Sequence, residues 1–537
     1  MKKKTVCKLI SLLIAVMFAV NIFAGCLGEK EVVEDVPTQD EVLPEGVPVI
    51  GGMTAKADDK FTLRYTSDEP INPFKCENVY NDAVASLIYE GLFKVDQQFK
   101  PIPVLCSGYS TEDGISFYFD IIETKMHDGS MLTASDVIYS INQARISSRY
   151  MMRLINIAYC VTDGADGIYI ELWEPDRALP ALLDIPIIKE GSVESAAPAG
   201  TGPYYFNSVG GNPGLSPFSG YRDPEAKLMD RIYLDNLDDG LLEERFANYT
   251  IDCIWEDTAG ERPINLYSDH EARYYDTSIL QYIGFNSSTP VFNDPNMRLA
   301  IYYAVNREQI VNDIYKGNGR AANLVLNPAY YLYSDTWEEG CGYSVAKISS
   351  YLASSGLDDR NSDGYLEYPV NGEYQYFELK FIVCDSNQKK VEVAESIAAN
   401  LRSVGLKIIL VKLPWAEYKD ALLEGEFDFY YAEVALNRDF DFRRILGEEG
   451  GLDYGEMGSE TGGEKCGAFL NAATDVEKAA AAQGLCDYVA ETAYIVPVMY
   501  RQYVVYTHRG VIANFTPSLS GVFSDAAGWT VDLKDEE

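Results

Sequence analysis

The sequence predicts an α/β fold that is divided into two or more lobes. The first observation is a strand–helix–strand pattern, in which the apolar runs 379–384 and 406–411 flank a segment, 391–404, with apolar residues at helical spacing. Such a unit implies parallel strands. The second observation is size: 537 residues, 47% of them hydrophobic and 12% aromatic, provide a large core and exceed one compact unit.

The N-terminal segment has the pattern of an export signal. Four lysines within residues 1–8 precede an apolar run, 9–24, that is short for a membrane-spanning helix of about 20 residues. Two small residues precede Cys26, as in a bacterial lipobox, so we expect Cys26 to be the diacylated N-terminus after removal of residues 1–25. An uncleaved anchor helix and an ordinary secreted protein are the alternatives. Residues 26–58 are acidic and aperiodic, which favours a flexible tether.

The folded region is expected to open with a strand at 61–65 and a helix from residue 80. The helix follows from apolar residues at three- to four-residue spacing, namely Ala83, Leu87, Ile88 and Leu92. A second strand is predicted at 115–121, because apolar and polar residues alternate after the turn Asp113-Gly114. Thr133 and Asp136 then form a capping-box pattern that predicts the start of another helix.

The middle of the chain continues with short strands and a capped helix. Residues 204–206, 231–235 and 250–254 are predicted strands, the first of them after a tight turn rich in glycine and proline. Asp294 is expected to cap a helix whose first residue, Pro295, has no amide hydrogen to lose there. The apolar face of that helix is expected to include Leu299, Ala300, Ile310 and Ile314.

The last part of the chain repeats the strand–helix alternation. Trp415, Tyr418 and Leu422 have the spacing of a short helix, and the residues at 429–434 form a β-rich run. A loop at 435–441 follows this predicted strand.

Several motifs, taken in order, resemble one protein family. Residues 89–92, 103–106, 113–119 and 126–137 follow one another as in the extracytoplasmic solute-binding proteins of peptide and nickel importers, family 5. The segments at 200–204, 282–307 and 415–428 extend the resemblance. It implies a two-lobed, periplasmic-binding-protein-like fold of type II, α/β in class, with an additional inserted subdomain.

The resemblance also implies domain boundaries. Lobe I is expected to comprise residues 59–80, 196–286 and 500–537, the inserted subdomain residues 81–195, and lobe II residues 287–499. A hinge is expected near residues 286–290, where such proteins cross between lobes.

The resemblance places a ligand site at the loop 435–441. Asp439 matches an aspartate that accepts a hydrogen bond from the α-ammonium of a peptide in oligopeptide-binding relatives, a charge-assisted bond that contributes about 1.5–3 kcal/mol. Asp441 is close enough in sequence to be the partner instead, and capping of the loop is the alternative role for Asp439. Trp415 matches a tryptophan that packs on ligand, with a role in the core as the alternative.

Three further residues enter through the resemblance. Glu77 matches an acidic position that faces ligand in some relatives, with a solvated loop acid as the alternative, and Tyr500 is expected to face the cleft. Glu433 stands where some relatives have a basic residue for the peptide α-carboxylate. A peptide of fixed length with a free carboxylate is therefore in doubt.

Composition excludes several classes of function. A formal charge of −38 disfavours nucleic acid and a basic membrane contact. The cysteines show no C-x-x-C pair and are expected to be buried small hydrophobes.

Asp359, Asn361 and Asp363 resemble a calcium loop, but position twelve is Val370 instead of glutamate, so a plain turn is preferred.

The expected function is therefore binding and not catalysis. The chain has three histidines and lacks H-E-x-x-H and G-x-S-x-G motifs, although paired carboxylates of a secreted glycoside hydrolase are a minor alternative. We expect a monomeric, cofactor-free lipoprotein on the outer face of the cell membrane that captures a peptide and delivers it to the permease subunits of an ABC importer. A non-peptide solute, such as an oligosaccharide or a metal chelate, and a peptide-sensing role are the alternatives.

Overall fold

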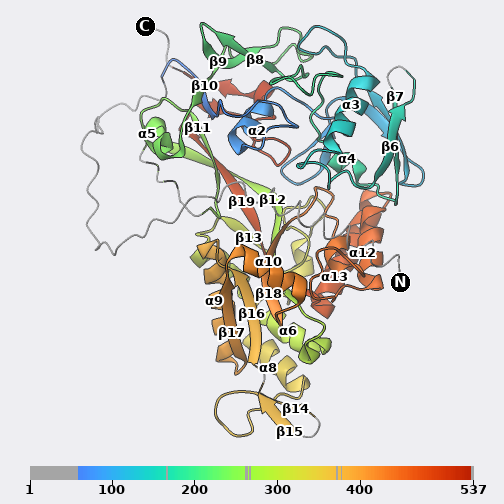
Figure 1. Cartoon of the computed structure of the whole chain (residues 1–537), viewed down its shortest axis with the longest axis vertical. Coiled ribbons are helices and arrows are strands. Elements are labelled where there is room, and N and C mark those ends of the chain that lie inside the picture. The colour runs from blue at the N-terminus through green and yellow to red at the C-terminus, as the bar shows by residue number, and fades with distance from the viewer. Residues whose placement is uncertain are drawn as a thin grey trace.

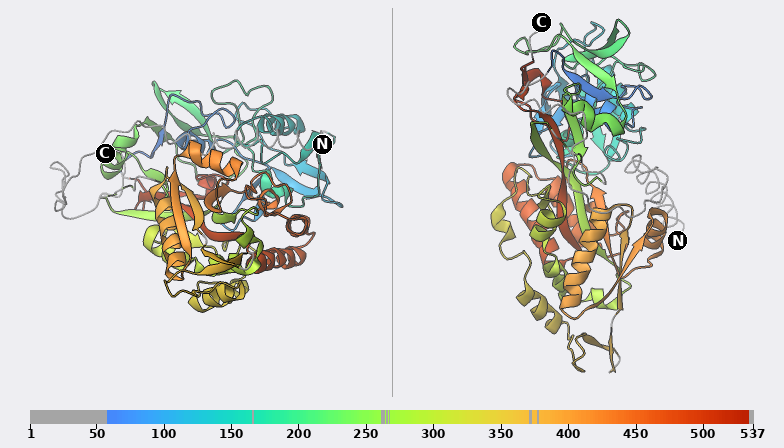
Figure 2. Two further views of the ribbon diagram at one scale, coloured as in Figure 1. Left: turned by 60° about the horizontal axis from the view of Figure 1, so that its bottom comes forward. Right: turned by 90° about the vertical axis from the view of Figure 1, so that its left-hand side faces the viewer.

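The computed structural model describes residues 58–533, except 165–166, 261–263, 265, 267, 371–372 and 377. The predicted export signal, Cys26 and nearly all of the predicted tether lie outside the described residues. The molecule is elongated, with a broad upper part and a narrower lower part joined by two long strands (Figures 1 and 2). We call the upper part lobe I together with its inserted subdomain, and the lower part lobe II.

Lobe I is built on a four-stranded sheet in the order β1-β10-β9-β8. The parallel pair β1 (Thr62–Tyr65) and β10 (Ile232–Asn236) confirms two predicted strands, and β9 (Asn212–Pro217) and β8 (Tyr204–Val209) add an antiparallel hairpin. The C-terminal segment returns to this lobe, where Trp529 packs against Phe61. It carries β20 (Ile512–Ala513), η5 (Ala526–Gly528) and β21 (Thr530–Val531).

The first helix is shorter than predicted. Helix α2 (Val79–Ala85) is capped by Asn78 and ends seven residues before Leu92. The apolar residues Leu87 and Ile88 are buried as expected, but their carbonyl groups accept hydrogen bonds from the amides of Tyr204 and Gly202. Pairing with this distant turn therefore replaces the helical hydrogen bonds that the local spacing predicted.

The inserted subdomain contains an antiparallel sheet in the order β4-β5-β7-β6. Its strands are β4 (Cys106–Ser110), β5 (Ser116–Ile121), β6 (Ile157–Thr162) and β7 (Gly167–Leu172). Helix α3 (Ala134–Ala144) covers one face and begins with the predicted capping box of Thr133 and Asp136. The short elements β2 (Phe93–Val95), β3 (Pro101–Pro103) and α4 (Leu179–Leu182) connect the subdomain to the rest of the molecule.

Two long antiparallel strands join the lobes. In Figure 1, β12 (His270–Phe285) and β19 (Ile495–His508) run from the upper part into the lower part. Their register shifts between Asp276 and Leu280 and again between Gln281 and Tyr282. The predicted hinge at 286–290 follows the end of β12, whereas these irregularities lie within the paired strands.

Lobe II extends the sheet of the two long strands. The sheet order is β11-β19-β12-β18-β16-β17, and β13 (Gly319–Ala321) also pairs with β19. Strands β16 (Glu378–Cys384) and β17 (Lys407–Leu413) are parallel and joined by α9 (Gln388–Ser403), which confirms the predicted strand–helix–strand unit. The other strands are β11 (Cys253–Asp257), on the lobe I side, and β18 (Phe429–Ala435).

Helices cover this sheet, and a small hairpin projects from the lower end (Figure 1). Helix α10 (Trp415–Glu424) begins at Trp415, and α13 (Asp475–Thr492) packs on α12 (Glu460–Leu470). The hairpin is β14 (Glu367–Val370) and β15 (Glu373–Tyr376). The remaining helical elements are η1 (Asp239–Leu241), α5 (Leu242–Ala247), η2 (Pro290–Asn293), α7 (Arg307–Gln309), η3 (Ile310–Ile314), η4 (Asp335–Glu338), α8 (Val345–Ser354) and α11 (Arg443–Leu446).

Helix α6 (Pro295–Ala304) begins as predicted and ends earlier. The Asp294 carboxylate accepts from the amide of Asn296, which confirms the cap. The prediction that Ile310 and Ile314 belong to the same helix is wrong, because Val305 is extended and Asn306 caps a new helical segment. The buried Arg307 donates to the carbonyl of Pro497 and so fixes this break.

The remaining local predictions concern cysteines, metals and membrane spans. The eight cysteines from Cys76 onward are free, and all except Cys341 are fully buried, as predicted. The Asp359 carboxylate accepts from the amides of Asp363 and Gly364, so this loop forms a turn, and the described residues contain no group of three or more acidic, histidine or cysteine side chains suited to a metal ion. Within the same residues, no helix combines the length and the apolar character that crossing a membrane requires.

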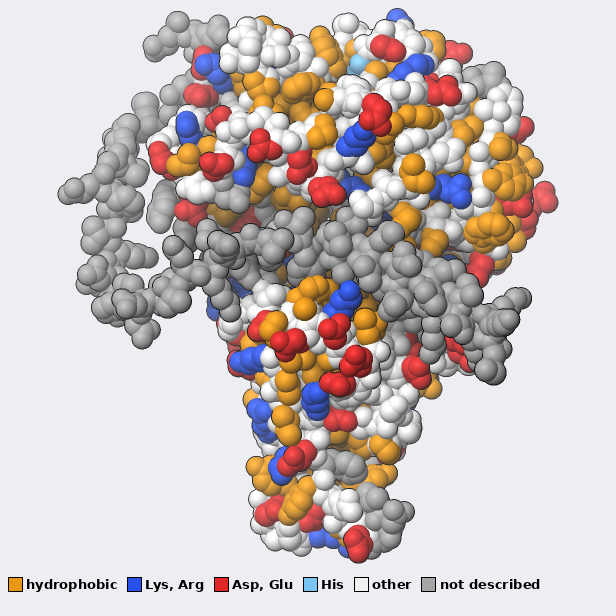
Figure 3. Space-filling view, in the orientation of Figure 1, with side chains coloured by type: hydrophobic (Ala, Val, Ile, Leu, Met, Phe, Trp, Pro, Cys, Tyr) orange, Lys and Arg blue, Asp and Glu red, His pale blue; other side chains and the backbone are white. Residues whose placement is uncertain are grey.

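The surface reflects the composition of the chain. On the face drawn in Figure 3, acidic side chains are spread over both lobes, with basic side chains among them. On this face, the acidic residues of a chain with 82 acids against 44 lysines and arginines are not gathered in one patch.

Candidate functional site

The loop between β18 and α11, residues 436–442, lies where lobe II meets the inserted subdomain. Its anchor is Phe440, a fully buried residue with a positive φ of 57° that is unusual for a bulky side chain. The Phe440 ring lies 4.9 Å from the ring of Phe99 in the inserted subdomain and 5.4 Å from Tyr330 in lobe II. We call this segment the β18–α11 loop. Its packing fixes the positions of the charged residues on either side of Phe440.

Two cavities adjoin this loop, and a third lies beside strand β18, which precedes it. The aromatic cavity, about 110 Å³, lies in lobe II and is bordered by Tyr282, Trp415, Tyr418, Glu433 and Tyr454. The large cavity, about 800 Å³, lies between lobe I, the inserted subdomain and the loop, and is bordered by Arg149, Arg153, Asp184, Arg438 and Tyr503. The acidic cavity, about 480 Å³, is bordered by Glu174, Asp441, Arg443, Glu448 and Glu449.

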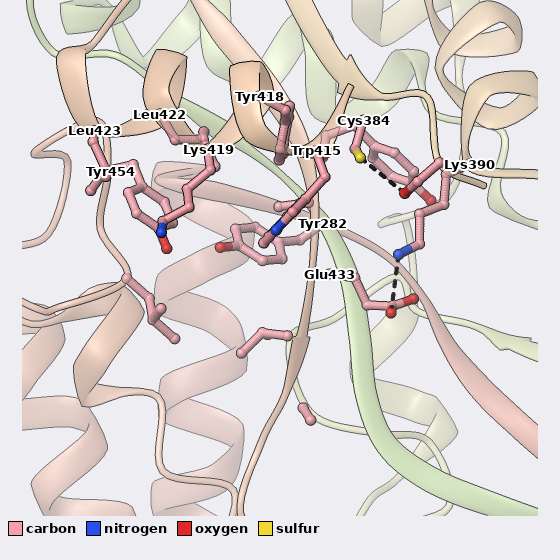
Figure 4. A pocket seen from close by; sticks show the side chains of 16 residues that line it. Tyr282, Cys384, Lys390, Trp415, Tyr418, Lys419, Leu422, Leu423, Glu433 and Tyr454 are labelled. Atoms are coloured by element: carbon pink, nitrogen blue, oxygen red, sulfur yellow. Dashed lines mark hydrogen bonds and ion pairs between the residues drawn. The ribbon is translucent and has the colours of Figure 1, made fainter. Parts of the chain in front are cut away.

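The aromatic cavity contains Trp415, one of the residues predicted to contact ligand. Figure 4 shows Trp415 projecting from α10 toward Tyr282, with Tyr454 and Lys419 on the other side. Trp415 packs 6.1 Å from Tyr418, centroid to centroid. The cavity therefore offers aromatic surface to an apolar or ring-shaped group of a ligand.

Glu433, at the edge of the same cavity, is neutralised within the fold. Its carboxylate lies 3.1 Å from Nζ of Lys390 and 2.9 Å from Nη1 of Arg501, and it accepts from Nε2 of the Gln281 side chain at 2.9 Å. Figure 4 shows the Lys390 contact. Two cations therefore stand beside the acid that replaces a basic residue of some relatives.

The large cavity contains a carboxylate shared by two arginines. Asp184, 2% exposed, pairs through one oxygen with Nη1 of Arg153, and its other oxygen lies 2.5 Å from Nε of Arg438. Ser520 donates to the same carboxylate at 3.0 Å. Burial and the nearby charge of Arg153 lower the pKa of Arg438 to about 10. Arg438 therefore remains charged at neutral pH.

The other arginines of the large cavity have one acid each. Arg149 pairs with Asp82, and Arg222 pairs with both oxygens of Glu90, at 2.8 Å for the Nη2 contact. Bidentate pairing of this kind neutralises the guanidinium and fixes its plane. The charge of Arg149 and of Arg222 is thus balanced locally.

Asp439 lies on the opposite side of the loop, in a buried group of acids. It is 4% exposed and borders none of the three cavities, and its carboxylate accepts from the amide of Asp441 at 3.1 Å. Burial, followed by the charges of Asp176 and Asp441, raises the pKa of Asp439. Burial also raises the pKa of Asp176 to about 6, and lowers that of Lys478, which faces both acids.

The structure separates the other predicted ligand residues. Asp441 borders the acidic cavity and pairs with Arg443 at 2.9 Å. Glu77 is exposed, two residues before Val79, which borders the large cavity. Tyr500 is fully buried and its hydroxyl donates to the carbonyl of Val325 at 2.6 Å, so it supports the Phe440 anchor from inside the core.

Sequence reasoning missed the buried charged residues that border the large cavity. Arg153, Asp184 and Arg438 are far apart in the chain, and no local pattern links them. Basic residues are scarce in this chain. An arginine next to Asp439 in a predicted ligand loop is therefore a signal that could have pointed to Arg438.

Two lobes joined by paired strands, with cavities where they meet, define a protein that holds a small molecule between lobes. Residues 100–441 match the family model of bacterial extracellular solute-binding proteins, family 5, middle region. The chain therefore belongs to the family 5 bacterial extracellular solute-binding proteins, as its motifs predicted.

Relatives and solved structures agree with this membership. A Brucella ovis protein named as an ABC transporter peptide-binding protein is 25% identical over 238 residues, which is 40% of this chain and 44% of that protein. The glutathione-binding protein of Salmonella paratyphi A is 25% identical over 316 residues, 54% of this chain and 60% of that protein. The chain thus matches less than two thirds of the length of these relatives.

The fold likeness covers much more of the chain. The structure of the oligopeptide-binding protein AppA from Bacillus subtilis, in complex with a nonapeptide, has a TM-score of 0.60 and 17% identity. It covers 89% of this chain and 100% of that chain. At this identity the likeness establishes the two-lobed fold. The relatives are binding proteins and not enzymes, in agreement with the predicted function class.

Proposed function

We propose that this protein is the lipid-anchored, extracytoplasmic solute-binding component of an ABC importer, which captures peptides between its lobes and delivers them to a membrane permease. The observation that supports it most is the β18–α11 loop, where lobe II meets the inserted subdomain and two cavities adjoin. The names of the relatives, an ABC transporter peptide-binding protein and a glutathione-binding protein, support a peptide as the solute.

Capture works through a shift between open and closed arrangements of the lobes. A solute that touches residues of both lobes makes all its contacts only when the lobes are closed, so it favours that state by its differential affinity. The contact of Phe99 with Phe440 joins the inserted subdomain to lobe II in this structure. The register shifts of β12 and β19 supply the position for the bend.

A peptide is recognised through its α-ammonium group and through one of its side chains. An α-ammonium is a suitable partner for the acids of the β18–α11 loop, Asp439 and Asp441, because its positive charge offsets the repulsion among Asp439, Asp176 and Asp441 that, with burial, raises the pKa of Asp439. Trp415 offers a surface for a side chain of the solute. Glu77 has a peripheral role in this scheme, and Tyr500 acts by supporting the loop.

The test is a thermal-shift screen of the full-length protein in mild detergent against pooled short peptides, oligosaccharides and metal chelates. A ligand at 100 times its Kd stabilises the folded state by about 2.7 kcal/mol. We expect a shift with peptides that is lost when their amino termini are acetylated. A shift with sugars or chelates alone would show that the solute is not a peptide.

Two variants locate the site within the same screen. Trp415→Ala is expected to weaken peptide binding about 5- to 30-fold, because loss of a buried aromatic contact costs about 1–2 kcal/mol. Asp439→Asn is expected to remove the dependence on a free amino terminus. A variant far from the cavities, Glu395→Gln, is the control and is expected to bind as the wild type does. Unchanged binding by both site variants would place the solute elsewhere.

Lipid anchoring is tested separately. We expect labelled palmitate to be incorporated in cells that express the wild type and not in cells that express Cys26→Ser. Incorporation by both proteins would contradict anchoring at Cys26.

A further inference from the structure

The large cavity has more basic than acidic side chains, in contrast to the chain as a whole. Lys94, Arg149, Arg153, Arg222 and Arg438 border it, against four acids, Asp82, Glu90, Asp184 and Asp525. The chain has 82 acidic residues and 44 lysines and arginines. A local excess of cations in so acidic a protein indicates a position built for negative charge.

The excess of positive charge in the large cavity is concentrated at one pair of arginines. Arg149 and Arg222 each have their own carboxylate, whereas Arg153 and Arg438 share Asp184. The side chains of Arg153 and Arg438 are only 10% and 15% exposed, so solvent does little to screen their mutual repulsion. One buried carboxylate therefore holds two buried guanidinium groups.

Each of these arginines keeps donors that the protein does not use. Arg438 donates through Nη2 to the carbonyl of Leu519 at 2.8 Å and approaches Asp184 through Nε. Arg153 donates through Nη1 to Asp184. Among the described residues, neither Nη1 of Arg438 nor Nη2 of Arg153 has a hydrogen-bond acceptor, although both side chains border the cavity.

We propose that the large cavity binds a carboxylate of the solute, which lies against Arg153 and Arg438 and supplies the second negative charge that Asp184 alone does not provide. Guanidinium groups cannot shed their charge by losing a proton, so an anion is the means of balancing this pair. A carboxylate matches the planar fork of a guanidinium and accepts two parallel hydrogen bonds. The proposal deepens the proposed function, on which it rests, by naming a charge that the solute carries.

The alternative is that the three residues only hold the inserted subdomain and lobe II together. Asp184 and Arg153 belong to the inserted subdomain, and Arg438 to the β18–α11 loop, so the Arg438–Asp184 pair crosses that contact, whereas the Arg153–Asp184 pair lies within the subdomain. One arginine beside Asp184 would suffice to join the two parts. Buried ion pairs also contribute little net stability, since replacing both charges of a pair is often neutral. The second arginine and the adjoining space of about 800 Å³ are what favour a ligand.

The experiment compares matched probes that differ in one carboxylate. A pool of tripeptides with free carboxyl termini, the same pool with amidated termini, and glutarate are titrated separately into the full-length protein by calorimetry. We expect the free-acid pool to bind about 10- to 150-fold more tightly than the amidated pool, the range that one charge-assisted hydrogen-bonded contact provides. Equal affinities for the two pools would overturn the carboxylate site and leave peptide binding intact.

Glutarate distinguishes a site that binds any carboxylate from a site that binds the carboxylate of a peptide. Binding of glutarate without binding of either peptide pool would support the carboxylate site and overturn the peptide function. Binding of none of the three probes would overturn the carboxylate site.

Variants assign the effect to the arginine pair. Arg153→Gln is expected to abolish the preference for the free acid, and Arg153→Lys, which keeps the charge without the fork, to retain part of it. Arg509→Gln removes an exposed arginine of lobe I and controls for net charge. If Arg153→Gln keeps the wild-type preference in a folded protein, the assignment is wrong, and Arg438→Lys provides the same test should Arg153→Gln fail to fold.

Discussion

Two neighbouring residues of the β18–α11 loop, Arg438 and Asp439, enter buried clusters of opposite composition. Arg438 joins Arg153 and Asp184, which gives two cations and one acid. Asp439 interacts with Asp176, Asp441 and Lys478, and Asp441 pairs with Arg443, which gives three acids and two cations. Both clusters lie where the inserted subdomain meets lobe II. We call them the arginine cluster and the aspartate cluster.

The difference lies in how each cluster can lose its surplus charge. A buried carboxyl group can bind a proton, and the pKa of Asp176, raised to about 6 by burial, shows that proton uptake is within reach near neutral pH. An arginine with a pKa of about 10 stays charged over the same range. The aspartate cluster is therefore sensitive to pH, whereas the arginine cluster depends on an anion, and it is the one that borders a large cavity.

The largest expected effect comes from removal of the acid in the arginine cluster. Asp184→Asn leaves two guanidinium groups without their shared carboxylate, at a position where the side chain is only 2% exposed. Because buried charges then lack a partner, we expect the free energy of unfolding to fall by about 3–5 kcal/mol. Denaturant unfolding measures the change. Asp82→Asn is the matched control, because Asp82 is 46% exposed and its pair with Arg149 is worth less than about 1 kcal/mol. Similar losses in both variants would mean that the shared carboxylate has no special role.

A smaller effect is expected in the aspartate cluster, and it depends on pH. The folded-state pKa of Asp176 is raised from 3.8 to about 6, so its carboxyl group favours the folded state below about pH 4. That contribution is lost as pH rises through about 6 and amounts to about 3 kcal/mol, at 1.36 kcal/mol per pKa unit.

Asp176→Asn, which mimics the protonated carboxyl group, tests this sign. The variant should gain stability relative to the wild type as pH rises from 4 to 7, measured by urea unfolding at each pH. A constant difference between the two proteins would show that Asp176 ionises normally. Asp184→Asn gives the comparison, since we expect its effect to change little over this range.

The smallest expected effect concerns an ion pair at the rim of the same contact. Glu174 is 66% exposed where it meets Arg443, and exposed pairs contribute about 0–1 kcal/mol. Glu174→Gln should therefore change the free energy of unfolding by less than about 1 kcal/mol and leave the pH profile unaltered. A loss as large as that of Asp184→Asn would show that burial does not rank these interactions.

Local signals predicted local structure well. The capping box of Thr133, the cap at Asp294 and the strand–helix–strand unit of β16, α9 and β17 depend on residues close in sequence, and all are present. The helix predicted through Leu92 ends at Ala85 because its continuation pairs with residues 202–204. Sequence spacing contains no information on such a distant partner.

The site shows the same limit. The loop after β18 was predicted from motifs, and Trp415 borders a cavity beside β18 itself. The roles of Arg438 and Asp439 depend on Asp184 and Asp176, which lie more than 250 residues away in the chain, and opposite charges are too numerous to be paired by inspection. Only the fold brings each pair together.

The two long strands between the lobes also determine how the molecule responds to force. The hydrogen bonds of β12 and β19 run across the strands, so a pull along the long axis loads many of them at once in shear. Bending instead loads the ladder where its register shifts, between Asp276 and Tyr282. The joint is therefore expected to be stiffer in extension than in bending.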